Sequence, residues 1–116
     1  NEIVSNFVAE NAIYHHDLEA GQKRSYTFGP DLGGGEFVFV RRSPDADEAD
    51  GWLMGLVIDI KNNTTQLQFF EALDIKKGPI GAVHIPHRIP PGFHGNWIPA
   101  SPRLFTINSK GWLICN

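Results

Sequence analysis

Four β-prone runs that follow one another through short loops are the feature that most restricts how this chain can fold. The runs cover residues 36–42, 51–60, 64–73 and 79–86, and loops at 43–50, 61–63 and 74–78 separate them. The loops carry proline, aspartate, asparagine or glycine, which favour turns. Strands joined by such short connections predict an antiparallel meander of four strands.

A four-stranded meander of this length has the size of one blade of a β-propeller. Two further β-prone runs, 11–18 and 23–28, precede it around Gly21, and we expect them to be the outer half of a preceding blade. We expect a glycine-rich loop at 29–35, before the meander begins. No helical periodicity of apolar residues extends over the length of a helix, so the predicted fold class is all-β.

The run "WLMGLVI" within 51–60 is apolar on both faces of the predicted strand. A strand of this kind needs cover on both sides, which an isolated four-stranded sheet does not give. We therefore expect the chain to be part of something larger. A small self-contained β-barrel is the alternative architecture.

The composition restricts the cellular setting and the partners. The chain has 116 residues, 41% of them hydrophobic and 20% charged, which is typical of a globular domain. A net charge of -3 without a basic run gives no reason to expect nucleic acid, and no apolar run is long enough to span a membrane. The single cysteine, Cys115, cannot form an internal disulfide, which favours a reducing compartment such as the cytoplasm.

His94 lies in the unusual stretch "RIPPGFHGNWIP", residues 88–99. Nearby glycines allow the backbone to approach a crowded site closely, and the prolines restrict the segment that leads to the histidine. These properties would suit an imidazole that binds a metal ion. A glycine-rich turn with a packed histidine explains the same residues, and no local partner completes a metal site.

The four other histidines are expected to be surface or strand-edge residues. His15 and His16 are neighbours on a predicted strand and should point to opposite faces, and His84 and His87 also fall on opposite faces of an extended run. Glu36 follows three glycines and opens a predicted strand. Its carboxylate would face solvent by default, or it would accept a hydrogen bond from a metal-bound histidine.

Three stretches together resemble the carotenoid cleavage oxygenases, a family that includes the lignostilbene dioxygenases. They are "YHHDLEAGQKRSYTFG", "GEFVFVRRSPDADEADGWLMGLV" and "GPIGAVHIPHRIPPGFHGNW", which cover approximately residues 11–98. They are collinear with the C-terminal end of those enzymes. The resemblance therefore implies C-terminal blades of a seven-bladed β-propeller at 1–98, followed by an atypical tail at 99–116.

The resemblance also implies a function. Members of this family hold a non-haem Fe(2+) ion with four histidines and use dioxygen to cleave a double bond of an apolar polyene or stilbene substrate. The histidine of their terminal "F-H-G" motif matches His94, and a glutamate that orients an iron-bound histidine matches Glu36. Phe93 and Trp97, beside His94, would help to line an apolar substrate tunnel, or they would serve ordinary packing. The other three ligands should lie upstream, so the isolated chain is expected to be inactive.

A non-enzymatic β-rich interaction module, or a decayed and inactive gene product, is the alternative function. Such a module would use exposed sheet edges or an exposed sheet face to pair with another chain. Three further histidines in β-rich surroundings upstream would favour the enzyme. Translation that starts near Asn1 would favour the module or the decayed gene product.

Overall fold

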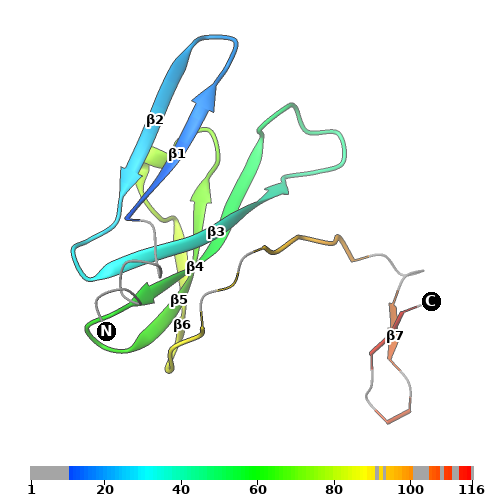
Figure 1. Cartoon of the computed structure of the whole chain (residues 1–116). Helices are drawn as coiled ribbons and strands as arrows, with labels where there is room; N and C mark the ends of the chain where they lie inside the picture. The colour runs from blue at the N-terminus through cyan, green and yellow to red at the C-terminus, as the bar shows by residue number, and fades with distance from the viewer. Residues whose placement is uncertain are drawn as a thin grey trace.

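The computed structural model describes residues 11–90, 92, 94–100, 105–107, 109–110 and 113–115. These residues form strands and one short 3₁₀ helix, η1 (Figure 1). In chain order the elements are β1 (Ala12–Asp17), β2 (Gln22–Thr27), β3 (Leu32–Arg41), β4 (Gly51–Asp59), β5 (Thr64–Glu71), η1 (Ile75–Lys77), β6 (Gly81–Ile85), β7 (Phe105–Ile107) and β8 (Leu113–Cys115). The chain is all-β apart from η1, as the sequence predicts.

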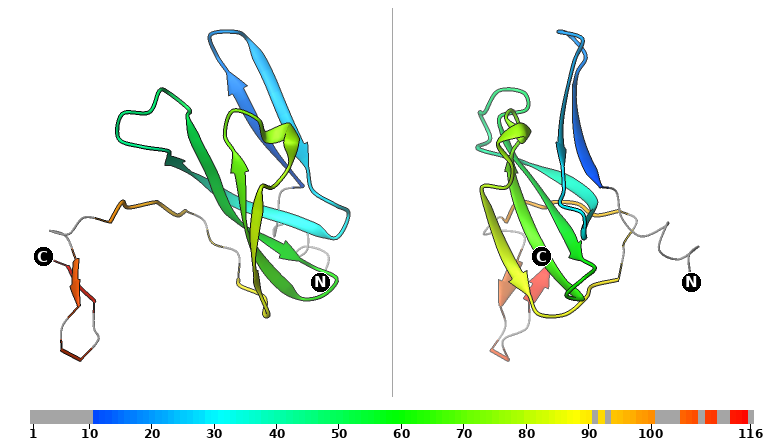
Figure 2. Two further views of the ribbon diagram at one scale, coloured as in Figure 1. Left: turned by 180° about the vertical axis from the view of Figure 1, so that it is seen from behind. Right: turned by 90° about the vertical axis from the view of Figure 1, so that its left-hand side faces the viewer.

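The central element is a four-stranded antiparallel sheet with the strand order β3-β4-β5-β6. Each strand pairs with the next one along the chain, so the predicted meander is confirmed. β1 and β2 form a separate two-stranded sheet, with Ala12 opposite Thr27 and Asp17 opposite Gln22. Figure 2 shows this hairpin standing beside the sheet rather than within it.

Aromatic side chains join the hairpin to one face of the sheet. Phe28, Val57, Phe70 and Ile75 are buried together, and Tyr26 and Phe37 pack against them. The ring of Phe70 makes edge-to-face contacts with the rings of Tyr26, Phe28 and Phe37, at centroid distances of 5.2, 6.3 and 5.5 Å. Such contacts add to the burial of apolar surface, so this cluster is the core of the described residues.

The prediction of a loop over residues 29–35 is partly wrong, because β3 already begins at Leu32. Gly33 and Gly34 pair with Ile58 and Val57 of β4. A Cβ atom on Gly34 would lie 2.7 Å from Cε2 of Phe28, which is closer than real Cβ atoms come. The glycine therefore gives the aromatic core room against the strand, a requirement that comes from tertiary packing rather than from local propensity.

The opposite face of the sheet is almost entirely apolar. Because paired residues point to the same side of a sheet, the register places Val38 beside Met54, and Leu56 beside Leu67. β4 therefore has apolar side chains on both faces, as its sequence predicts. Ile80 and Val83 are 45% and 52% exposed, so apolar side chains also remain accessible along the edge formed by β6.

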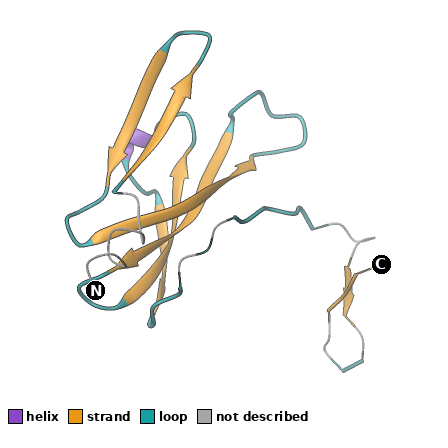
Figure 3. Ribbon diagram, in the orientation of Figure 1, coloured by secondary structure: helices purple, strands orange, loops and turns teal. Residues whose placement is uncertain are grey.

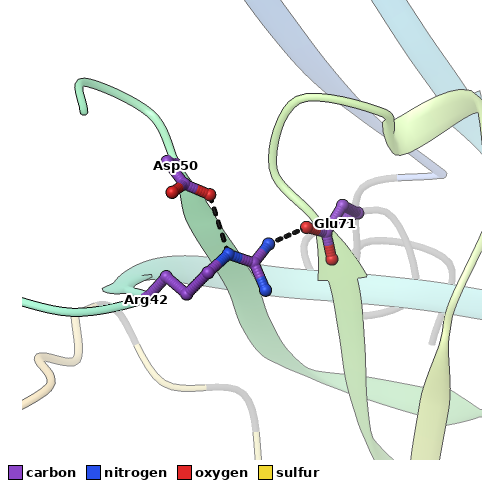
Figure 4. Close-up of polar contacts among 3 residues, drawn as sticks. All are labelled: Arg42, Asp50 and Glu71. Atoms are coloured by element: carbon purple, nitrogen blue, oxygen red, sulfur yellow. Dashed lines mark hydrogen bonds and ion pairs between the residues drawn. The ribbon is translucent and has the colours of Figure 1, made fainter. Parts of the chain in front are cut away.

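Arg42 connects the loop at 43–50 to the sheet, as Figure 4 shows. Its Nε donates to Oδ1 of Asp50 at 2.8 Å, and its Nη2 donates to Oε1 of Glu71. The guanidinium also stacks over the ring of Trp52, 4.6 Å from its centroid. The hydrogen bond to Asp50, with smaller contributions from Glu71, raises the pKa of Arg42, and the guanidinium charge compensates both carboxylates.

The segment after residue 98 contains a small hairpin. β7 and β8 pair with each other, with Phe105 opposite Cys115, and Figures 1 and 3 show them away from the four-stranded sheet. The division of the chain at residue 98 remains a prediction. Within the described residues, no helix is long and apolar enough to cross a membrane.

Candidate metal centre

The segment that carries His94 crosses the apolar face of the sheet. We call residues 86–90, 92 and 94–96 the strap. At one end of the crossing the backbone N–H of Ile89 donates to Oγ1 of Thr65 on β5, at 2.9 Å. At the other end the N–H of Gly95 donates to Oε2 of Glu36 on β3, at 2.5 Å. The strap therefore runs from β5 to β3 and passes over β4, which lies between them.

Glu36 does not open a strand, as the sequence analysis expects, but lies inside β3. It falls where the register of β3 against β4 shifts between Gly34 and Phe37, which marks a β-bulge or a similar irregularity. A bulge leaves a residue unpaired and turns its side chain away from the regular alternation. Both oxygens of Glu36 face the strap, since Oε2 accepts from Gly95 and Oε1 lies 3.4 Å from Nδ1 of His94.

This contact determines which nitrogen of the His94 imidazole carries the proton. An ionised carboxylate can only accept hydrogen bonds, so the contact favours the tautomer with the proton on Nδ1. The Nε2 atom then carries the lone pair that a metal ion requires. The His94 side chain is 89% exposed, so this nitrogen is accessible from outside the described residues.

The donor set of this chain fits one position of a metal site. A neutral imidazole held by a carboxylate behind it is a common arrangement around protein-bound metals. Within the described residues, no group of three or more His, Cys, Asp or Glu side chains could hold a metal ion. His94 would therefore need further ligands from elsewhere in the protein, as the resemblance implies.

An apolar groove of about 230 Å³ lies between the strap and the sheet, with Glu36 and His94 among its lining residues. Its sheet side includes Val38, Met54 and Leu67, and its strap side includes Ile89. The imidazole and the carboxylate therefore lie beside apolar walls, while the His94 side chain itself stays exposed. The arrangement can hold a metal-binding imidazole next to apolar surface.

Two further residues were predicted to contact substrate. Phe93 lies outside the described residues. Trp97 is 44% exposed, its backbone N–H donates to Oδ1 of Asn96 at 2.8 Å, and it is not among the residues that line the groove. A role for either residue in lining a substrate tunnel remains a prediction.

The other histidines lie on other elements. His16 packs near Tyr14 on β1, with a centroid distance of 6.4 Å, whereas His15 is partly buried and its Nδ1 has no hydrogen-bond partner in the described part of the chain. This difference agrees with the prediction that the two point to opposite faces. His84 on β6 and His87 in the following bend are exposed.

The sequence did not predict the roles of Thr65 and Gly95. Thr65 accepts a hydrogen bond from the strap, and Gly95 donates one from the strap to Glu36. The one available signal for Thr65 was a hydroxyl in a strand whose partner, β4, is apolar on both faces. The glycines near His94 were expected to let the backbone approach closely, whereas Gly95 contributes its backbone N–H, which donates to Glu36.

Comparison with known proteins identifies the family. Residues 3–99 match the family model described as "Retinal pigment epithelial membrane protein". The chain is 40% identical over 91 residues to lignostilbene-alpha,beta-dioxygenase isozyme III of Sphingomonas paucimobilis, an alignment that covers 78% of this chain and 19% of that enzyme. The chain thus spans about a fifth of the length of this relative.

Solved structures give the same result. The lignostilbene dioxygenase of Pseudomonas brassicacearum matches with a TM-score of 0.77 and 32% identity, over 81% of this chain and 20% of that one. A cobalt-substituted apocarotenoid oxygenase of Synechocystis matches with a TM-score of 0.73 and 33% identity, over 78% and 19%. These structures are β-propellers, which confirms the predicted fold class of a four-stranded propeller blade. The relatives that the chain matches include a dioxygenase, and the chain belongs to the carotenoid oxygenase family.

Proposed function

We propose that this chain is part of an iron(II)-dependent dioxygenase that cleaves a carbon–carbon double bond of a carotenoid, apocarotenoid or stilbene-type substrate. The observation that carries the proposal is the contact between His94 and Glu36 at the rim of an apolar groove. Family membership supports it, since relatives of the chain are named for the cleavage or oxygenation of lignostilbenes and apocarotenoids.

His94 supplies one iron ligand through Nε2 in this proposal. Glu36 accepts the hydrogen bond from Nδ1–H, which selects the tautomer whose Nε2 can bind the metal and makes Nε2 a better electron donor. Neutral imidazole suits ferrous iron, and an all-nitrogen site with open positions leaves room for other ligands. The remaining three histidines come from parts of the protein outside the described residues.

The bound iron would supply the activation of dioxygen beside the alkene. In the balanced reaction the double bond breaks and each of its carbons gains one oxygen atom of dioxygen, giving two carbonyl products without an external reductant. The residues of this chain hold the Nδ1 proton of His94 and supply apolar walls beside it, in the groove, for the apolar substrate. Phe93 and Trp97 line the path of the apolar substrate in this account.

The cytoplasm, which the single cysteine predicts, is the compartment that we propose for the enzyme. A reducing compartment favours the ferrous state. The expected partners are the apolar substrate and dioxygen.

The test uses the longest gene product that contains this chain, loaded with iron(II). It is incubated with a stilbene and, separately, with an apocarotenoid under isotopically labelled dioxygen. We expect two carbonyl products from at least one substrate, each with one labelled oxygen, and no products from His94→Ala. Failure of the iron-loaded protein to cleave either class would contradict the proposal.

A further inference from the structure

Thr65 is a buried hydroxyl on an otherwise apolar part of the sheet. Thr65 is 0% exposed, and it pairs with Ile58 on β4 and with Ile85 on β6. A hydroxyl in such surroundings loses its water and needs a protein partner. The partner lies in the strap, since Oγ1 of Thr65 accepts the backbone N–H of Ile89 at 2.9 Å.

This hydrogen bond is one of two that fix the strap on either side of the histidine. The first joins Ile89 to Thr65, and the second joins Gly95 to Glu36. His94 lies between these two points in the sequence. The same carboxylate that accepts from Gly95 lies beside Nδ1 of His94, so the place where the strap meets β3 also determines the orientation of the imidazole.

The residue that follows Ile89 restricts the backbone, so the position of Ile89 affects the position of His94. Pro90 follows Ile89 directly, and its ring fixes φ, so the start of this part of the strap has less freedom than an ordinary loop. Ile89 and Pro90 line the apolar groove as well. Movement of Ile89 away from β5 would therefore move the residues that lead to His94.

We propose that Thr65 is a positioning residue for His94: its hydroxyl fixes the start of the strap and so directs the imidazole to the metal. This inference rests on the proposed function, because a metal at His94 is what the positioning serves. Thr65 acts through Ile89 and the strap, and it contacts neither metal nor substrate.

The test compares Thr65→Ser with Thr65→Ala in the longest gene product that contains this chain. The two variants differ by one hydroxyl. Each is loaded with cobalt(II), and its metal affinity and visible absorption band are measured together with its thermal stability. Thr64→Ala is the matched control, because Thr64 lies on the same strand but pairs with Asp59 at the end of the ladder and makes no hydrogen bond to the described residues of the strap.

We expect Thr65→Ser to keep the affinity and the absorption band of the wild type. Thr65→Ala should bind cobalt about tenfold more weakly, as is common when a residue that supports a metal ligand is removed, and its band should change in shape or intensity. Thr64→Ala should leave both unchanged. A role in stability alone would lower the melting temperature of Thr65→Ala without moving the affinity or the band of the folded protein, and that result would overturn the inference.

His94→Ala separates this inference from the function on which it rests. If His94→Ala binds cobalt like the wild type, or if the wild type gives no cobalt band, the proposed function fails. If His94→Ala loses the metal while Thr65→Ala retains the affinity and band of Thr65→Ser, the proposed function stands and the role of Thr65 is wrong.

Discussion

The Nδ1 atom of His94 lies 3.4 Å from Oε1 of Glu36, although 58 residues separate the two in the chain. The second oxygen of Glu36 accepts the backbone N–H of the next residue, Gly95, at 2.5 Å. One carboxylate thus fixes both the backbone and the imidazole of the same segment. An irregularity in β3 presents the carboxylate, and the strap brings the imidazole to it across the apolar face of the sheet, from β5 over β4.

Replacement of Glu36 by glutamine should weaken metal binding. Gly95 and His94 contact different oxygens of Glu36, and glutamine replaces one of these oxygens by an NH₂ group, which would face a donor. We expect a loss of about 10- to 100-fold in metal affinity, the usual effect of removing an orienting carboxylate. The measurement is a cobalt or iron titration, with Glu48→Gln in the exposed loop at 43–50 as control. Unchanged affinity in Glu36→Gln would show that the carboxylate does not support the ligand.

Replacement of Gly55 by alanine should destabilise the sheet. A Cβ atom on Gly55 would lie 2.7 to 2.8 Å from three atoms of the Phe37 ring, which itself packs edge-to-face on Phe70 at 5.5 Å. The ring cannot move without disturbing the core, so we expect a loss of about 1–3 kcal/mol in the free energy of unfolding, measured by urea denaturation.

Two variants control this prediction. Gly29→Ala should cost little, because its nearest new contact is Cδ1 of Leu32 at 3.8 Å. The cost of Gly55→Ala should also shrink in a Phe37→Leu background, where the ring is gone. An equal cost in both backgrounds would assign the effect to the backbone of β4 instead.

Asp59 should titrate below the usual range of an aspartate. The side-chain amide of Asn62 donates to its Oδ2 at 2.8 Å and the backbone N–H of Asn62 donates to its Oδ1 at 2.9 Å, and both lower the pKa of Asp59. Because the folded pKa lies below the unfolded one, the stabilisation is present at higher pH and is lost as the pH falls through the folded pKa.

Asn62→Ala should therefore raise the pKa of Asp59 toward its ordinary value, as followed by NMR of the carboxyl carbon. Lys61→Ala should raise it less, since the charge of Lys61 is a smaller cause of the shift. A pKa of Asp59 that does not move in Asn62→Ala would refute the role of this amide.

Arg42→Lys should loosen the loop at 43–50. Lysine cannot keep a planar fork on Asp50 and Glu71 while stacking over Trp52. Hydrogen exchange of the loop should rise modestly, because exposed ion pairs contribute little, and the difference from wild type should shrink at high salt. Arg41→Lys is the control, since within the described residues the Arg41 side chain donates to the carbonyl of Pro44 and bridges no pair of carboxylates. Equal exchange in both variants would contradict this account.

Much of the fold could be predicted because strands and turns are encoded locally. Alternating apolar residues and loops with proline, aspartate or asparagine gave the meander, and the apolar run of β4 required the cover that its two faces receive from the hairpin and the strap. The start of β3 could not be predicted, because Gly33 and Gly34 have low strand propensity. The place of Gly34 in the ladder depends on Phe28, which follows β2 and leaves no room for a Cβ atom at this position.

The candidate site depended on recognition of the family more than on local pattern. The glycines and prolines around His94 fit a turn as well as a ligand, and nothing near Glu36 in sequence points to His94. The contact between Thr65 and Ile89 was beyond reach, because it depends on the register of β5 and on the path of the strap after β6.

The most direct test of the central claim is the iron content of the longest gene product that contains this chain, compared between wild type, His94→Ala and His87→Ala. His87 is exposed in the bend after β6 and serves as the matched histidine control. The account predicts stoichiometric iron in the wild type and in His87→Ala, and little or none in His94→Ala. Equal iron in all three proteins, or none in the wild type, would contradict the assignment of His94 as a metal ligand.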